Sequence, residues 1–223
     1  MIQNELNTFW QNIDHVFLDM DGTLLDKHFD DYFWEHFVPE RFAEKEGISV
    51  IQARKLLLQK YKNCEGTLAW TDLDFWSTEL DLDIPALKIK VDHLICVHPY
   101  VIDFMLFCRK VGKTVTMVTN AHSKTLAIKM NKTALSGYFD QIICSQEVGL
   151  AKEDPLFWKL LHKHVVYDPA RTLLADDTEK VLISAEIYGI ISLIYVARPS
   201  SKSLPKKSKR FKSIIFFNEL IPE

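Results

Sequence analysis

Five short apolar runs recur along the chain, and apolar residues follow one another in each of them without alternating with polar ones. A strand with this composition is buried on both faces, which favours a parallel sheet covered by helices on both sides. Helical patterns separate the later runs, for example over residues 154–165, as in successive βαβ units. We therefore predict an α/β fold with a doubly wound parallel sheet. The expected strands are residues 15–20, 114–120, 141–145, 172–177 and 191–197.

One long interval, residues 27–98, breaks this alternation because it contains no convincing strand. Its patterns are helical, for example Phe29, Phe33 and Phe37 at a spacing of four residues. A helical block inserted directly after the first strand is expected to cover the carboxyl ends of the strands, where open α/β sheets bind ligands. We predict a Rossmann-like core of residues 1–26 and 99–223 with an α-helical cap of residues 27–98.

Composition limits the classes of partner. The 223 residues are 48% apolar, which suits one good-sized core or a core with a small accessory domain. A net charge of −3 gives no general argument for nucleic acid, and neither a signal peptide nor a membrane span is expected. The four cysteines have neither paired nor metal-binding spacing, so we expect free, mostly buried thiols in a reducing cytoplasm. Nothing in the pattern requires more than a monomer.

Polar residues gather where the predicted strands end. Because parallel strands end at one edge of a sheet, these side chains should converge. Several confined carboxylates repel one another unless a cation holds them, and oxygen ligands of this kind favour Mg²⁺ with a phosphate as co-ligand. The pattern indicates a phosphoryl-transfer site with a carboxylate nucleophile. The residues concerned are Asp19, Asp21, Thr119, Asn120, Lys152, Asp176 and Asp177.

Taken singly, these residues also have ordinary structural interpretations. Asp19 and Asp21 could form a solvated turn after a strand, and Asp176-Asp177 could cap the helix that follows. Lys152 alone would be read as a surface lysine, and Thr119 as a strand residue. Their combination in one chain favours the site.

The set resembles the haloacid dehalogenase-like hydrolase superfamily. The D-x-D-G-T motif of that superfamily is matched by residues 19–23, and its later motifs by Thr119, Lys152 and the pair Asp176-Asp177, in the same order. One departure is Val181, which stands where many relatives carry Asp or Asn. Support for the metal ligands would then come from elsewhere, for example from Thr178 or Glu179.

The resemblance implies a role for each residue. Asp19 would attack phosphorus, and Asp21 would protonate the leaving oxygen and then activate water; an acid at position 21 favours a phosphatase over a dehalogenase. Thr119 and Lys152, with backbone amides near Met20 and at Asn120, would bind the phosphoryl oxygens. Magnesium would be held by Asp19, the carbonyl of Asp21, Asp177 and, through water, Asp176.

The cap and the segments 118–129 and 152–158 resemble bacterial GMP/IMP 5′-nucleotidases, which implies a purine nucleoside monophosphate as substrate. Aromatic residues of the cap could stack on a base: Tyr32, Trp34, Trp70, Phe75 and Trp76. Alternatives are a phosphatase for a sugar phosphate or phosphoglycolate, a phosphomutase, and a non-catalytic binding protein. The basic stretch 202–212 is expected to be a solvated loop between the last two strands, and attraction of anionic ligands or RNA is the alternative.

Overall fold

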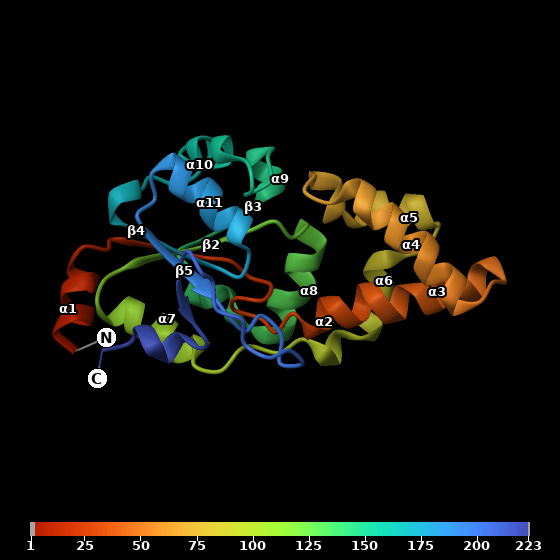
Figure 1. Ribbon diagram of the computed structural model, residues 1–223, viewed down its shortest axis with the longest axis horizontal. Coiled ribbons are helices and arrows are strands. Elements are labelled where there is room, and N and C mark those ends of the chain that lie inside the picture. The colour runs from red at the N-terminus through yellow and green to blue at the C-terminus, as the bar shows by residue number, and fades with distance from the viewer. Residues whose placement is uncertain (1–2, 223) are drawn as a thin grey trace.

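The computed structural model describes residues 3–222, and its sheet has six strands, all parallel (Figure 1). Their order across the sheet is β3-β2-β1-β4-β5-β6, which confirms the predicted doubly wound α/β fold. Met1, Ile2 and Glu223, which belong to the predicted core, lie outside the described residues. The strands are β1 (His15–Leu18), β2 (Thr114–Thr119), β3 (Gln141–Cys144), β4 (Thr172–Asp176), β5 (Ser192–Val196) and β6 (Lys212–Ile214).

Helices cover both faces of this sheet, as continuous apolar strands require. In Figure 1, α1 (Gln3–Gln11) and α7 (Val101–Lys110) lie on one side, and α10 (Pro155–Leu161) and α11 (Glu179–Tyr188) on the other. Two apolar clusters fill the layers. Val16 and Leu18 of β1 belong to one cluster and Phe17, between them, to the other. The remaining helices of the core are α8 (Ser123–Thr133) and α9 (Ser145–Val148).

Helix ends follow the local signals with one exception. Pro155 occupies the first turn of α10, and Gly112 and Gly189 follow α7 and α11 with positive φ angles of 68° and 117°. The pattern over residues 154–165 predicted a longer helix than α10, which ends at Leu161. The short helix α1 was not predicted, and β6, which begins at Lys212, was expected only as a strand without bounds after the basic stretch. Burial of the Trp10 indole, which donates to the Leu220 carbonyl at 2.7 Å, fixes α1 against the C-terminal segment.

The segment inserted between β1 and β2 is helical, and no strand lies within residues 27–98, all of which the structure describes. The chain leaves and re-enters the core at adjacent points: the Asp26 N–H donates to the Cys96 carbonyl, and the His98 N–H to the Leu24 carbonyl, both at 2.9 Å. Whether residues 27–98 behave as a separate unit stays a prediction. The helices are α2 (His28–Tyr32), a π-helical turn (Phe33–Phe37), α3 (Val38–Glu46), α4 (Val50–Cys64), α5 (Leu73–Leu80) and α6 (Ile84–Lys90).

Most aromatic side chains of this segment pack against one another. The rings of Trp34 and Trp70 lie 5.9 and 6.4 Å from that of Trp76, whose residue is 1% exposed, and Phe75 contacts the same ring edge-on at 5.1 Å. Trp34, Phe75 and Trp76 belong to the apolar interior of the inserted helices, the usual role of aromatic residues at helical spacing. Trp70 lies at its edge and is 36% exposed, and Tyr32 lies beside a hollow described below.

Among the described residues, no helix combines the length and the apolar character needed to cross a membrane. Cys64, Cys96, Cys108 and Cys144 are free thiols. Only Cys108 and Cys144 are buried, so the predicted burial holds for half of them.

The central strand should dominate stability. Phe17 is fully buried, and its ring contacts that of Tyr167 edge-on at 4.7 Å. Because truncation leaves a cavity, we expect Phe17→Ala to lower the free energy of unfolding by about 3–5 kcal/mol. Val166→Ala, at a position 84% exposed, should change it by less than about 0.5 kcal/mol. Urea denaturation measures both. Equal effects of the two substitutions would contradict the assignment of β1 to the core.

Candidate active site

Three carboxyl groups meet at the carboxyl end of the sheet. Asp19 directly follows β1, Asp176 is the last residue of the neighbouring strand β4, and Asp177 comes next. One oxygen from each lies within 4.8 Å of the others. The strand order reverses between β1 and β4, and open α/β sheets bind ligands at such points. The predicted convergence of these three residues is therefore observed.

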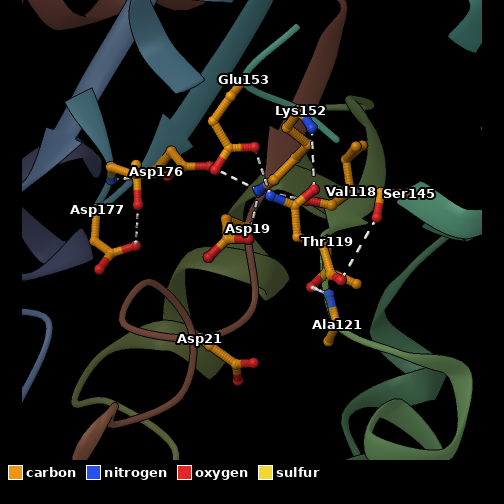
Figure 2. A network of polar contacts seen from close by, with 12 residues as sticks. Asp19, Asp21, Val118, Thr119, Ala121, Ser145, Lys152, Glu153, Asp176 and Asp177 are labelled. Carbon is orange, nitrogen blue, oxygen red and sulfur yellow. Dashed lines mark hydrogen bonds and ion pairs between the residues drawn. The ribbon is translucent and has the colours of Figure 1, made fainter. Parts of the chain in front are cut away.

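Lys152 lies between two of these carboxylates (Figure 2). Its residue is 1% exposed, and its Nζ donates to Asp19 Oδ1 at 2.5 Å, to Asp176 Oδ2 at 2.7 Å and to the Val118 carbonyl at 3.0 Å. A buried ammonium group requires such partners because removal from water is costly. Lys152 is thus a buried member of the site.

The backbone around Lys152 is fixed by neighbouring side chains. Its N–H donates to Asn120 Oδ1 at 3.0 Å, and its carbonyl accepts from Ser184 Oγ. The Asn120 amide in turn donates to Glu153 Oε2 at 2.9 Å. The Asn120 side chain therefore orients the lysine loop, and its main chain remains the group predicted to bind substrate.

Asp177 packs against Gly22, and any larger residue at position 22 would force neighbouring atoms to move. A Cβ on Gly22, whose φ is +86°, would lie 2.5 Å from Asp177 Oδ2. The positive φ angle also disfavours any other residue. Lys27 Nζ approaches the same Oδ2 at 3.3 Å, and Thr178 Oγ1 donates to Oδ1 at 3.4 Å. Thr178 thus supplies the support expected from position 178 or 179, while Val181 is buried in the apolar core.

Thr119 is buried at the end of β2, and its Oγ1 accepts from the Ala121 N–H at 3.0 Å. This bond orients the hydroxyl at the sheet edge beside Lys152, as Figure 2 shows. Met20 is fully buried, so its side chain is closed off from a ligand, and the contact expected of its N–H stays a prediction.

Asp21 lies apart from the grouped carboxylates. Figure 2 shows its side chain below and away from Asp176 and Asp177, and its oxygens are absent from the group within 4.8 Å. Its Oδ1 pairs instead with Lys129 Nζ at 2.5 Å. The Asp21 carboxyl group is therefore not part of the group of carboxylates, and the metal contact expected of its backbone carbonyl stays a prediction.

Burial controls the protonation of these groups. It raises the pKa of Asp19, Asp21, Asp176 and Asp177 to about 6, since water no longer stabilises the charged form. The Lys152 ammonium opposes this rise for Asp19 and Asp176, Lys129 for Asp21 and Lys27 for Asp177.

The donor set fits a hard divalent cation. Asp19, Asp176 and Asp177 offer carboxylate oxygens alone. Within residues 3–222, the ammonium groups that pair with them are those of Lys27 and Lys152, two positive charges against three negative ones. Oxygen ligands with an excess of negative charge suit Mg²⁺. The absent Cβ of Gly22 keeps the space beside Asp177 open.

A second group of possible ligand atoms comprises Asp72, Asp74 and His122. Asp74 is exposed and pairs with Lys124, and His122 Nδ1 accepts from the Lys124 N–H at 3.3 Å. His122 is buried, and its Nε2 lies 3.5 Å from Asp72 Oδ1. The grouping alone gives no reason to place an ion there.

A hollow of about 500 Å³ is lined in part by Lys27, whose Nζ donates to Asp177 Oδ2. Residues from the start of the inserted helices and from the loop after β5 line it. The rings of Tyr32 and His36 are stacked there, with centroids 5.8 Å apart and planes at 15°. Lining side chains with hydrogen-bonding groups are Lys27, His28, Asp31, Tyr32, Glu35, His36, Ser200, Lys202 and Ser203.

Sequence reasoning missed several charged residues beside the site, namely Lys27, Asp30, Lys88, Lys129 and Glu153. One usable signal was present for two of them. Lys88 follows buried Ile84 by four residues, and Lys129 follows buried Thr125 by four, so both lysines lie on the buried faces of their helices. A lysine at such a position needs a buried partner.

These features define a class of protein. The haloacid dehalogenase-like hydrolase family model matches residues 13–186, and the chain belongs to this family. It is 36% identical over 217 residues to the GMP/IMP nucleotidase YrfG of Escherichia coli (strain K12), across 97% of this chain and 98% of that protein. A protein of the same description from Shigella flexneri matches equally.

Solved structures support the fold. A HAD phosphatase from Thermococcus onnurineus superposes with a TM-score of 0.79 at 22% identity, covering 93% of this chain and 96% of that one. A putative beta-phosphoglucomutase from Thermotoga maritima gives 0.67 at 17% identity with the same coverage. The architecture is therefore shared with enzymes of more than one description.

The raised pKa of Asp177 predicts a stability effect without metal. The folded protein holds this proton up to about pH 6 and the unfolded chain only to about pH 4, so ionisation between pH 5 and 8 lowers stability. Asp177→Asn removes the ionisation. We expect its free energy of unfolding, relative to wild type, to increase by about 1–2 kcal/mol from pH 5 to pH 8.

Urea denaturation in EDTA at both pH values measures this difference. Asp103→Asn, at an exposed position of α7, is the matched control and should show no such trend. A relative stability of Asp177→Asn that stays constant or falls with pH would refute the assigned burial effect.

Proposed function

We propose that the protein is a Mg²⁺-dependent phosphomonoester hydrolase that converts GMP and IMP to the nucleoside and phosphate. The observation that carries this proposal is the grouping of Asp19, Asp176 and Asp177 around buried Lys152 at the sheet edge. The 36% identity to a GMP/IMP nucleotidase over nearly the whole chain supports the substrate class.

In the proposed reaction an Asp19 oxygen attacks phosphorus while the bond from phosphorus to the nucleoside 5′ oxygen breaks. Asp21 gives its proton to that leaving oxygen, so the nucleoside departs neutral. The deprotonated Asp21 then takes a proton from a water molecule whose oxygen attacks the phosphorus of the aspartyl-phosphate. The bond between phosphorus and the Asp19 oxygen breaks, which releases phosphate and restores the Asp19 carboxylate. The separation of Asp21 from the other carboxylates supports this division of roles.

Mg²⁺ would be held by Asp19, Asp177, the carbonyl of Asp21 and, through water, Asp176. When bound, it supplies positive charge to the phosphoryl oxygens. Lys152 and the Thr119 hydroxyl would hold the equatorial oxygens, together with the N–H groups of Met20, Asp21 and Asn120.

The hollow beside Lys27 is the proposed site of the nucleoside. Tyr32, stacked on His36, offers an aromatic face for a base. Guanine and hypoxanthine both carry an N1–H donor that adenine lacks, and the carboxylates of Asp31 and Glu35 in this hollow could accept from it. This donor pattern supports a preference for GMP and IMP over AMP.

The cellular compartment, the oligomeric state and the partners of the enzyme are also proposals. The free thiols suit a reducing compartment, and we infer a cytoplasmic enzyme. We also infer a monomer, with neither nucleic acid nor membrane as partner; the basic stretch 202–212 contributes Lys202 to the hollow and is otherwise largely exposed loop.

Phosphate release from a panel of phosphomonoesters tests the proposal. We expect turnover of GMP and IMP that EDTA abolishes and Mg²⁺ restores, with at least about 10-fold lower kcat/KM for AMP, glucose 6-phosphate and phosphoglycolate, because these lack the N1–H group. Asp19→Asn should lower kcat by at least about 10³-fold, since it removes the nucleophile.

Asp103→Asn should retain full activity. If a sugar phosphate were the preferred substrate, the proposed specificity for GMP and IMP would be wrong, while the proposed mechanism would stand. Undiminished activity of Asp19→Asn would overturn the mechanism.

A further inference from the structure

Two buried lysines connect Asp21 to the inserted helices. Lys129 Nζ pairs with Asp21 Oδ1 and with Asp30 Oδ2, both at 2.5 Å. Lys88 Nζ pairs with the other oxygen of Asp30 at 2.9 Å. The side chains of Lys129 and Lys88 are 1% and 2% exposed. The four residues form a continuous chain of ion pairs, here called the lysine bridge: Asp21, Lys129, Asp30 and Lys88.

The members of the lysine bridge come from distant parts of the sequence. Asp21 follows β1, Lys129 lies on α8 of the core, and Asp30 and Lys88 belong to α2 and α6 of the inserted segment. Figure 1 shows α2 and α6 next to α8. Asp30 of the inserted helices is thus connected to Asp21 through Lys129 alone.

Charge and packing make this arrangement specific. A buried ammonium group that loses a carboxylate partner destabilises its surroundings strongly, so Lys129 requires Asp21 and Asp30 together. The rings of Phe29 and Phe33 lie 4.8 and 4.5 Å from Lys88 Nζ and close off that end. Although burial acts in the opposite direction, Lys129 and Lys88 hold the pKa of Asp30 below its usual range, so this carboxylate stays charged.

The contact also defines how Asp21 is presented. Lys129 binds Oδ1, so proton transfer to a leaving group falls to Oδ2. Rotation of the carboxyl group would break a charge-assisted hydrogen bond to a lysine whose side chain is only 1% exposed. The position of Oδ2 is therefore fixed by Lys129, which is itself fixed by Asp30.

We propose that Lys129 and Asp30 are positioning residues that orient the Asp21 carboxyl group for proton transfer, so that acid–base chemistry depends on the docked position of α2. This inference rests on the proposed function, because it assigns an orientation to the residue that protonates the leaving oxygen. A lysine bridge that merely held the two parts of the protein together would affect every substrate equally.

Dependence on the leaving group separates these roles. Loss of the nucleoside 5′ oxygen requires a proton, whereas p-nitrophenolate departs readily without one. Rapid-quench measurement of the first phosphoryl transfer, following guanosine from GMP and nitrophenol from p-nitrophenyl phosphate, isolates this step. Asp21→Asn supplies the reference pattern for a missing acid.

We expect Lys129→Met and Asp30→Asn to slow transfer from GMP by about 10²-fold or more and transfer from p-nitrophenyl phosphate by less than about 5-fold. The matched control is Lys132→Met, which removes the surface pair of α8 with Asp92 of the inserted segment, 3.2 Å apart, without reaching Asp21. It should leave both rates unchanged. Lys129→Arg, which keeps the charge, should recover part of the GMP rate.

Equal losses with both substrates in Asp30→Asn and Lys129→Arg would overturn the inference and leave a structural role only. These two variants retain polar or charged groups, so they test it even if Lys129→Met does not fold. If the wild type hydrolyses p-nitrophenyl phosphate but not GMP, only the proposed substrate is refuted. The test of the lysine bridge would then use another alkyl phosphate that the enzyme hydrolyses in place of GMP. A wild-type protein inactive on every phosphomonoester would overturn both proposals.

Discussion

Three carboxyl groups meet at the edge of the sheet, where little water reaches them. One oxygen from each of Asp19, Asp176 and Asp177 lies within 4.8 Å of the others. Like charges at this separation repel unless cations lie among them. The parallel pairing of β1 with β4 makes the approach unavoidable, because both strands end at the same edge. The buried position of Lys152 and the glycine at position 22 both follow from this constraint.

The same constraint explains why Asp21 is treated differently from its neighbour two residues away. A fourth carboxylate in the group would add repulsion, whereas Lys129 gives it a separate partner. The inserted helices supply Asp30 to that lysine and Tyr32 to the adjoining hollow. One segment therefore contributes both to the proposed binding of the nucleoside and to the placement of the acid.

Patterns local in sequence predicted a large part of this structure. Continuous apolar runs located five strands, and strand ends located Asp19, Thr119, Asp176 and Asp177, since parallel strands bring their ends together. The lysine bridge was beyond such patterns because its ion pairs join residues 58 to 108 positions apart. Helical spacing could likewise not separate Tyr32, beside the hollow, from Trp76, in the apolar interior.

The central claim is that the Asp19 carboxylate itself receives the phosphoryl group. Acid quenching during turnover of GMP, followed by borohydride reduction and peptide mass spectrometry, tests it directly, because borohydride converts an aspartyl-phosphate to homoserine. The account predicts homoserine at position 19, formed only with Mg²⁺ and substrate present. Homoserine at another aspartate, or none at any position while phosphate is released in a rapid burst, would contradict it.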